Sequence, residues 1–148
     1  MIEKIQEDLI EAQKAKDELK VSTLRLLLGA IKNYAIAKES TSYNPSEEEI
    51  VGVVQKEIKQ RKESIESYKA GGRQELADKE SKELEILQAY LPEQMSEEEI
   101  RKLVEAAISE TGAASMQDMG KVMGVLSLTL KGKADMGVVS GIVKEKLQ

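Results

Sequence analysis

Histidine and cysteine are both absent from the 148 residues of this chain. Without imidazole, the chain lacks the side chain that ordinarily exchanges protons near neutral pH, and it lacks histidine ligands for a metal. Ser-His-Asp and Cys-His catalysis are therefore excluded. The missing thiols exclude disulfides and cysteine-bound metals. We expect no metal site and no cofactor.

Aromatic residues are also scarce, with no tryptophan, no phenylalanine and four tyrosines. Proteins that bind single-stranded nucleic acid stack the bases on aromatic rings, so the sequence disfavours that mode, and we expect no DNA partner. No apolar run approaches the roughly 20 residues that span a bilayer, so we expect no membrane partner. The composition, 41% hydrophobic and 33% charged, is typical of a folded soluble protein.

The first residues, "MIEKIQEDLIEAQ", are acidic and amphipathic. A signal peptide has a basic start and an apolar centre, and a transit peptide has few acidic residues, so this segment is typical of neither. A chain without cysteine also suits a reducing compartment. We therefore expect a cytoplasmic protein.

Apolar residues recur at helical spacing along almost the whole chain, and no segment shows sustained alternation. Two capping boxes, Ser46 with Glu49 and Ser96 with Glu99, mark the clearest helix starts. The pattern predicts an all-α chain with seven helices, at residues 2–19, 21–38, 46–70, 73–91, 97–110, 117–130 and 136–147.

Pro92, in the segment "LPEQMS" at 91–96, breaks the helical pattern and is the best candidate for a linker. We expect an N-terminal four-helix domain at 1–92 and a small three-helix domain at 93–148. Residues 1–91 carry 15 Lys and Arg against 18 Asp and Glu, and residues 92–115 carry 2 against 6. Residues 116–148 carry 5 against 3, so an acidic chain ends in a mildly basic segment.

This basic segment contains a predicted turn, "KGKAD", at 131–135. Gly132 stands where a left-handed glycine ends a helix, and Asp135 stands where an N-cap begins the next. We interpret Gly132 and Asp135 as structural turn residues. Lys131 and Lys133 then lie at the apex of the turn.

Four further glycines are spaced as Gly120 with Gly124 and Gly137 with Gly141, so that each pair shares a helix face. A glycine inside a helix costs about 1 kcal/mol relative to alanine, so these positions need a reason. Close packing of two helices is the simpler explanation, and we expect it. The alternative, which stays open, is that the faces admit a sugar-phosphate backbone.

On that alternative the candidate RNA contacts are Lys121, Lys131 and Lys133, with Gly120 and Gly124 as the positions of close approach. The acidic clusters at 47–49 and 97–99 are explained by helix capping, so we assign no catalytic residue and no metal ligand.

Several segments resemble the YqeY branch of the GatB/YqeY family. They are "YLPEQMSEEEI" (90–100), "DMGKVMGVL" (118–126) and "GKADMGVVSGIVKEKL" (132–147), with "TLRLLLGAIKN" (23–33) and "YKAGGRQELADKESKELEILQAYLP" (68–92) upstream. The resemblance covers nearly the whole chain. It implies a helical N-terminal domain and a three-helix C-terminal domain similar to the tail of GatB. The residues that fall on the shared motif are Gly120, Lys121, Gly124, Gly132, Lys133, Ala134 and Asp135.

GatB is a subunit of the tRNA-dependent amidotransferase, which converts misacylated Glu-tRNA or Asp-tRNA to the Gln or Asn form with nitrogen from glutamine. Its tail helps to hold the tRNA. The resemblance therefore associates this chain with carbon–nitrogen ligases that use glutamine as amido-nitrogen donor. The sequence contains no amidase Ser–Lys signature and no nucleotide-phosphorylating cradle, so we expect no such catalysis from this chain alone.

Two functional hypotheses remain. In the first, the protein is a non-catalytic tRNA-binding or tRNA-amidotransferase-associated protein whose C-terminal domain meets structured tRNA by shape and phosphate contacts. In the second, it is a protein-interaction adaptor in translation, with proteins of the translation or aminoacyl-tRNA machinery as partners and no direct RNA binding.

Overall fold

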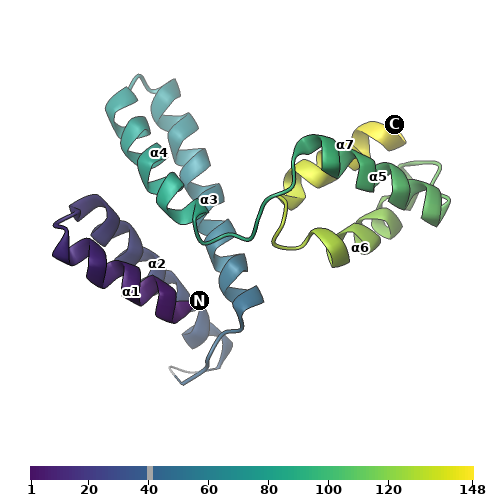
Figure 1. The fold of residues 1–148 in the computed structure, drawn as a ribbon. Helices are drawn as coiled ribbons and strands as arrows, with labels where there is room; N and C mark the ends of the chain where they lie inside the picture. The colour runs from purple at the N-terminus through teal and green to yellow at the C-terminus, as the bar shows by residue number, and fades with distance from the viewer. Residues whose placement is uncertain (40–41) are drawn as a thin grey trace. The chain divides into compact units, whose positions relative to one another are not determined.

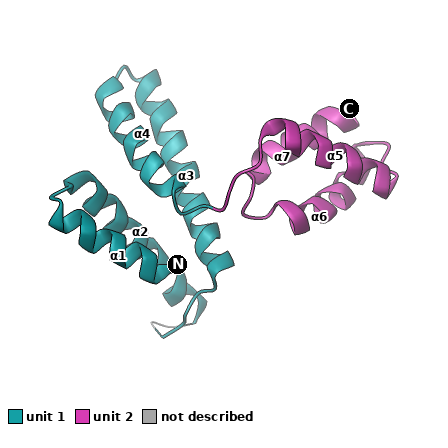
Figure 2. Ribbon diagram, in the orientation of Figure 1, with its two compact units in different colours: residues 1–91 teal, residues 92–148 magenta. Residues whose placement is uncertain are grey.

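The computed structural model describes residues 1–39 and 42–148, which form seven α-helices, one short 3-10 helix and no strand (Figure 1). The prediction of an all-α chain is confirmed. The chain divides into two compact units, Met1–Leu91 (unit 1) and Pro92–Gln148 (unit 2), shown in different colours in Figure 2. None of the helices in the described ranges is both long and apolar enough to cross a membrane.

Unit 1 consists of two helical hairpins. Helix α1 (Ile2–Lys14) lies beside α2 (Glu18–Lys38), and α3 (Glu47–Ala70) lies beside α4 (Gln74–Gln88) (Figure 1). Each helix buries one apolar stripe, and the stripes meet in a shared core. This core contains Ile5, Leu24, Leu27, Ile31, Ile50, Val53, Val54, Ile58, Leu87 and Tyr90.

The first helix is shorter than its apolar stripe predicts, because it ends at Lys14 rather than at residue 19. Lys16 has a φ of 58°, in the left-handed region that ends a helix. Asp17 then caps α2, and its carboxylate accepts a hydrogen bond from the backbone N–H of Lys20 at 3.1 Å. Because the apolar stripe continues across Asp17, its periodicity alone does not reveal that one helix ends and the next begins there.

Polar contacts also join separate segments within unit 1. The guanidinium of Arg61 on α3 forms an ion pair with the carboxylates of Glu80 and Glu83 on α4. The Tyr90 hydroxyl donates a hydrogen bond to Asp8 Oδ2 at 2.6 Å. This bond connects the residues that follow α4 to helix α1. That hydrogen bond is the main reason that the pKa of Asp8 lies below its ordinary value. Burial raises the pKa of Tyr90.

Unit 2 is built from α5 (Glu97–Thr111), the 3-10 helix η1 (Met116–Asp118), α6 (Met119–Leu130) and α7 (Met136–Leu147). Both predicted capping boxes are confirmed, Ser46 with Glu49 at the start of α3 and Ser96 with Glu99 at the start of α5. The core of unit 2 is formed by Ile100, Val104, Ala107, Val122, Leu126, Leu130, Ala134, Val139, Ile142, Val143 and Leu147.

Candidate nucleic-acid interface

The glycines of α6 lie on a face of the helix that is open to solvent. Gly120 and Gly124 are exposed, and among the described residues no atom lies within 4 Å of a Cβ added at either position. Helix α6 packs instead through Val122, Leu126 and Leu130. The prediction that these glycines serve close helix packing is therefore wrong, because the buried stripe lies on the opposite side of the helix.

The glycine pair of α7 gives the same result. Gly141 is exposed, and within the described ranges a Cβ added there would meet no atom within 4 Å. At Gly137 an added Cβ would meet only the carboxylate of Asp135, the cap of the same helix, at 3.1 Å. Both glycine pairs thus leave helix backbone accessible rather than bringing two helices together.

Lys121 is exposed one residue after Gly120. Its Nζ lies 4.0 Å from Asp118 Oδ1, a long and weak ion pair at the surface. The pKa of Asp118 is lowered, mainly by the backbone N–H of Ala114, which donates to the carboxylate at 3.0 Å, and further by the charge of Lys121. The aspartate therefore stays ionised and offsets part of the positive charge beside the glycine face.

The turn between α6 and α7 is held by local backbone conformation. Gly132 is buried with a φ of 80°, and the Asp135 carboxylate accepts from the backbone N–H of Gly137 at 2.8 Å. The backbone N–H of Lys133 donates to the Leu130 carbonyl at 2.9 Å. This geometry leaves the side chains of Lys131 and Lys133 exposed at the apex.

The turn is also bonded to the segment that precedes α5. Gln94 Nε2 donates to the Gly132 carbonyl at 2.9 Å, and the Met95 N–H donates to the Lys133 carbonyl at 2.9 Å. Lys133 lines a hollow of ≈ 330 Å³ together with Glu93 and Glu99. Its charge therefore lies in a mixed rather than a purely positive environment.

The three candidate lysines do not form one cluster. Lys131 and Lys133 share the turn at the end of α6, whereas Lys121 lies in the first turn of that helix. At 1.5 Å of rise per residue, the ten residues from Lys121 to Lys131 correspond to about 15 Å along the axis. Gly120 and Gly124 lie near the Lys121 end of the helix, so the structure offers a strip along α6 and not a compact phosphate pocket.

Ion pairs join the end of α7 to the acidic helix α5. Lys146 Nζ lies 2.8 Å from Glu105 Oε1, and Arg101 on α5 bonds Glu97 on the same helix and Glu145 on α7. The hydrogen bond from Lys146 lowers the pKa of Glu105. Of the two lysines in the last turn of α7, Lys146 is therefore paired with a carboxylate of α5.

Sequence reasoning missed one conspicuous surface residue. Leu128 is 87% exposed and lies on the side of α6 that carries Gly124 and Lys121, because residues spaced by three, four and seven share a face. Its position outside the apolar stripe of α6 could have predicted that Leu128 is exposed. Within residues 1–39 and 42–148, no group of three or more carboxylates could hold a metal ion.

The comparisons with known proteins agree on the family. The family model for Yqey-like protein matches residues 2–147. Similar proteins include several named "Altered inheritance of mitochondria protein 41, mitochondrial". The protein of Vanderwaltozyma polyspora is 31% identical over 96% of this chain and 79% of its own length. The protein of Pyrenophora tritici-repentis is 31% identical over 100% of this chain and 79% of its own length. The protein of Saccharomyces cerevisiae is 33% identical over 79% of this chain and 65% of its own length.

These names contradict the expectation of a cytoplasmic location, because they describe the relatives as mitochondrial proteins. The expectation rested on missing cysteine and on the character of the first residues. Amino-acid composition reports the chemistry of a folded chain and not the compartment to which the chain is sent. The match over residues 2–147 and the identity to these relatives together show that the chain belongs to the Yqey-like protein family.

Proposed function

We propose that this protein is a non-catalytic tRNA-binding protein, associated with tRNA-dependent amidotransfer, and that its C-terminal part meets structured tRNA through α6 and the following turn. The observation that carries the proposal is the open glycine face of α6, formed by Gly120 and Gly124 beside the exposed Lys121. Two exposed glycines in a helix lower its stability without any gain in packing. They do let a sugar-phosphate backbone come close to the helix.

The resemblance of unit 2 to the tail of GatB supports the same partner, since that tail helps to hold tRNA. Exposed lysines at both ends of the strip supply phosphate contacts, and shape recognition of folded RNA does not require aromatic stacking. As part of this proposal, residues 1–92 form a four-helix domain and residues 93–148 a three-helix domain that carries the RNA contact.

Filter binding of bulk tRNA to the full chain at low salt tests the proposal. A Lys121→Glu/Lys131→Glu/Lys133→Glu variant is expected to lose most of the affinity. The slope of log affinity against log salt should fall by about 2 to 3, since roughly one counterion is released per phosphate contact. The matched control is Lys59→Glu/Lys62→Glu/Lys69→Glu, which makes the same charge change at exposed positions of α3. Undetectable tRNA binding, or equal losses in the two variants, would refute the proposal.

A second variant addresses the glycine face directly. Gly124→Gln adds a bulky neutral side chain without changing charge, and the open space around the position should leave the fold intact. We expect weaker tRNA binding with an unchanged circular dichroism spectrum. Gly52→Gln, at an equally open glycine of α3, is the control and should bind as the parent does.

The alternative function is a protein-interaction adaptor in translation without direct RNA binding. The observation that favours it is Leu128, because a leucine that is 87% exposed suits a protein surface better than a phosphate backbone. Pull-down from cell extract with and without ribonuclease separates the two functions. A partner that survives nuclease and is lost in Leu128→Ser would favour the adaptor.

A further inference from the structure

Helix α2 differs in charge from the rest of unit 1. It carries Lys20, Arg25, Lys32 and Lys38 against a single carboxylate, Glu18, and residues 19–38 contain no acidic residue. The remainder of residues 1–91 carries 11 Lys and Arg against 17 Asp and Glu. Helix α2 is therefore a basic helix within an acidic unit, and its cations favour a partner that carries negative charge.

The outward side of α2 combines two of these cations with exposed apolar side chains. Leu26 is 60% exposed and Ile36 is 44% exposed, on the side opposite the buried Leu24, Leu27 and Ile31. Arg25, Leu26, Gly29, Lys32 and Ile36 share this side by helical spacing, and we call these five residues the α2 face.

Two further properties describe the α2 face. Gly29 is exposed, and a Cβ added there would meet no atom within 4 Å in the ranges that the structure describes. Arg25 and Lys32 form no ion pair within those same ranges. The α2 face therefore offers open backbone between two cations whose charges are available to a partner.

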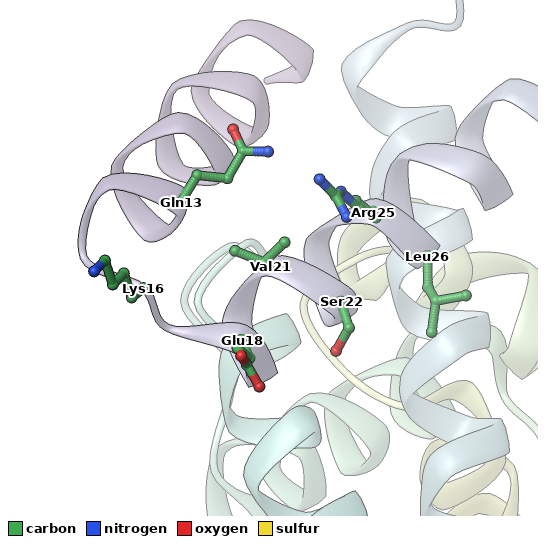
Figure 3. Close-up of a pocket in the computed structure, with 7 residues that line it drawn as sticks. All are labelled: Gln13, Lys16, Glu18, Val21, Ser22, Arg25 and Leu26. Carbon is green, nitrogen blue, oxygen red and sulfur yellow. The ribbon is translucent and has the colours of Figure 1, made fainter.

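The α2 face leads into a hollow of ≈ 680 Å³ between the end of α1 and the start of α2, lined by Gln13, Lys16, Glu18, Val21, Ser22, Arg25 and Leu26. Figure 3 shows Gln13 reaching toward it from α1, and Val21 and Arg25 from α2. Val21 and Leu26 supply apolar surface there, and Arg25 borders it with a positive charge. The hollow is suited to an apolar side chain that is followed or preceded by a carboxylate.

We propose that the α2 face docks an acidic amphipathic helix of a partner protein. Apolar side chains of that helix would cover Leu26 and Ile36 and enter the hollow, its carboxylates would meet Arg25 and Lys32, and Gly29 would allow close approach of the two helix backbones. Recognition of an amphipathic helix by an apolar surface with flanking charges of opposite sign is a common mode of protein binding.

The same features disfavour the other classes of occupant. An RNA backbone would leave Leu26 and Ile36 without an apolar partner. A membrane-surface helix needs a broad apolar face, whereas this one has two large apolar side chains. A second copy of the chain would set the cations of one α2 face against those of another.

This inference does not rest on the proposed tRNA binding, which concerns α6 in unit 2. Because the chain has no cysteine, a Gly29→Cys variant can carry one photo-cross-linker at the centre of the α2 face. The probe is a synthetic acidic amphipathic helix with leucines at helical spacing flanked by glutamates. The control peptide has lysine in place of each glutamate. Fluorescence anisotropy measures affinity for the full chain, and irradiation maps the contact.

We expect the acidic peptide to bind, to be cross-linked from position 29, and not to be cross-linked from Gly52→Cys on α3. Arg25→Glu/Lys32→Glu and Leu26→Ser should each weaken binding at least tenfold. Lys59→Glu/Lys62→Glu, with the same charge change on α3, should not weaken it. Circular dichroism confirms that each variant is folded.

Absence of binding by the acidic peptide, equal binding by the lysine peptide, or equal cross-linking from positions 29 and 52 would overturn the proposal. Cross-linking from position 29 to tRNA, to an anionic vesicle or to a second copy in preference to the acidic peptide would overturn it as well. Loss of tRNA binding in the α6 variants would leave this result unchanged, so the two proposals fail separately.

Discussion

Single residues in the C-terminal part show how a glycine can be required at one position and dispensable at another. Gly132 has a φ of 80° in the turn before α7, a conformation that costs other residues about 1–2 kcal/mol. Gly141 lies within α7 with ordinary helical backbone and open space around it. The first glycine is needed for conformation, whereas the second lowers helix stability unless a partner uses the space.

Alanine substitutions at these two glycines should therefore have opposite effects. Gly141→Ala is expected to stabilise the protein by about 1 kcal/mol, because alanine favours the helix and meets no atom within 4 Å. Gly132→Ala should destabilise it by about 1–2 kcal/mol. Urea unfolding followed by circular dichroism measures both values. A loss of stability in Gly141→Ala would show that the helix face is covered in the folded protein.

The hydrogen bond from Tyr90 to Asp8 gives a second prediction at the residue scale. Tyr90→Phe should lower the free energy of unfolding by about 1 kcal/mol at neutral pH, the net value of such a bond. Because the folded-state pKa of Asp8 is depressed, this stability is present above the ordinary aspartate pKa of about 3.9 and is lost as pH falls through the lower folded value. The difference between the parent and Tyr90→Phe should therefore shrink below about pH 4. A difference that persists unchanged to lower pH would contradict the assignment to Asp8.

At the scale of elements, α3 and α4 are joined by a buried ion pair as well as by apolar packing. Arg61 is 9% exposed and Glu83 is 7% exposed, and the Arg61 Nε has no hydrogen-bond partner among the described atoms. A buried guanidinium depends on its carboxylates, since removal of one partner leaves a charge in a poorly hydrated site. The hairpin is therefore sensitive to the loss of either side chain.

Removal of one member of this pair should cost more than replacement of both. We expect Glu83→Ala to destabilise the protein by about 3 kcal/mol, because Arg61 loses its most buried partner. Arg61→Met/Glu83→Leu should cost less, since apolar residues of similar size need no compensation. Thermal unfolding of the two variants compares them. A double variant that is less stable than Glu83→Ala would show that the ion pair itself is a net source of stability.

The bounds of the helices show which local signals suffice for prediction. The starts of α3 and α5 follow from capping boxes that lie within four residues of sequence. The end of α1 does not follow from its apolar stripe, because the left-handed Lys16 and the Asp17 cap interrupt a pattern that otherwise continues. A capping residue inside a continuous apolar stripe, such as Asp17, can be predicted only if its capping preference is given more weight than the periodicity.

At the scale of the whole molecule, the chain divides at residues 91 and 92 into two units. Unit 2 has its own core, and the Gln94 and Met95 hydrogen bonds that hold its turn lie after that boundary. A unit of this size buries a smaller fraction of its surface on folding than a larger domain does, and it is therefore marginal in stability. The few polar contacts at its edge should therefore have a measurable effect.

A fragment of residues 92–148 is expected to fold by itself with a helical spectrum and a cooperative melting transition. A fragment of residues 96–148, which keeps the Ser96 cap of α5 but lacks Gln94 and Met95, should melt at a lower temperature because the turn at 132–133 loses two hydrogen bonds. Circular dichroism melting of both fragments provides the measurement. An unstructured 92–148 fragment would mean that unit 2 depends on unit 1.

The sequence by itself determined the all-α class, the two capping boxes and the breaks at Gly132 and Pro92, because these depend on residues a few positions apart. Only the tertiary structure decided which helix faces are covered. Gly120 and Gly124 have the spacing of a packing face, yet the buried side of α6 is the one that carries Val122 and Leu126. The exposure of Leu128 and of the α2 face was decided in the same way. Burial depends on contacts between segments distant in the chain, and local spacing does not contain that information.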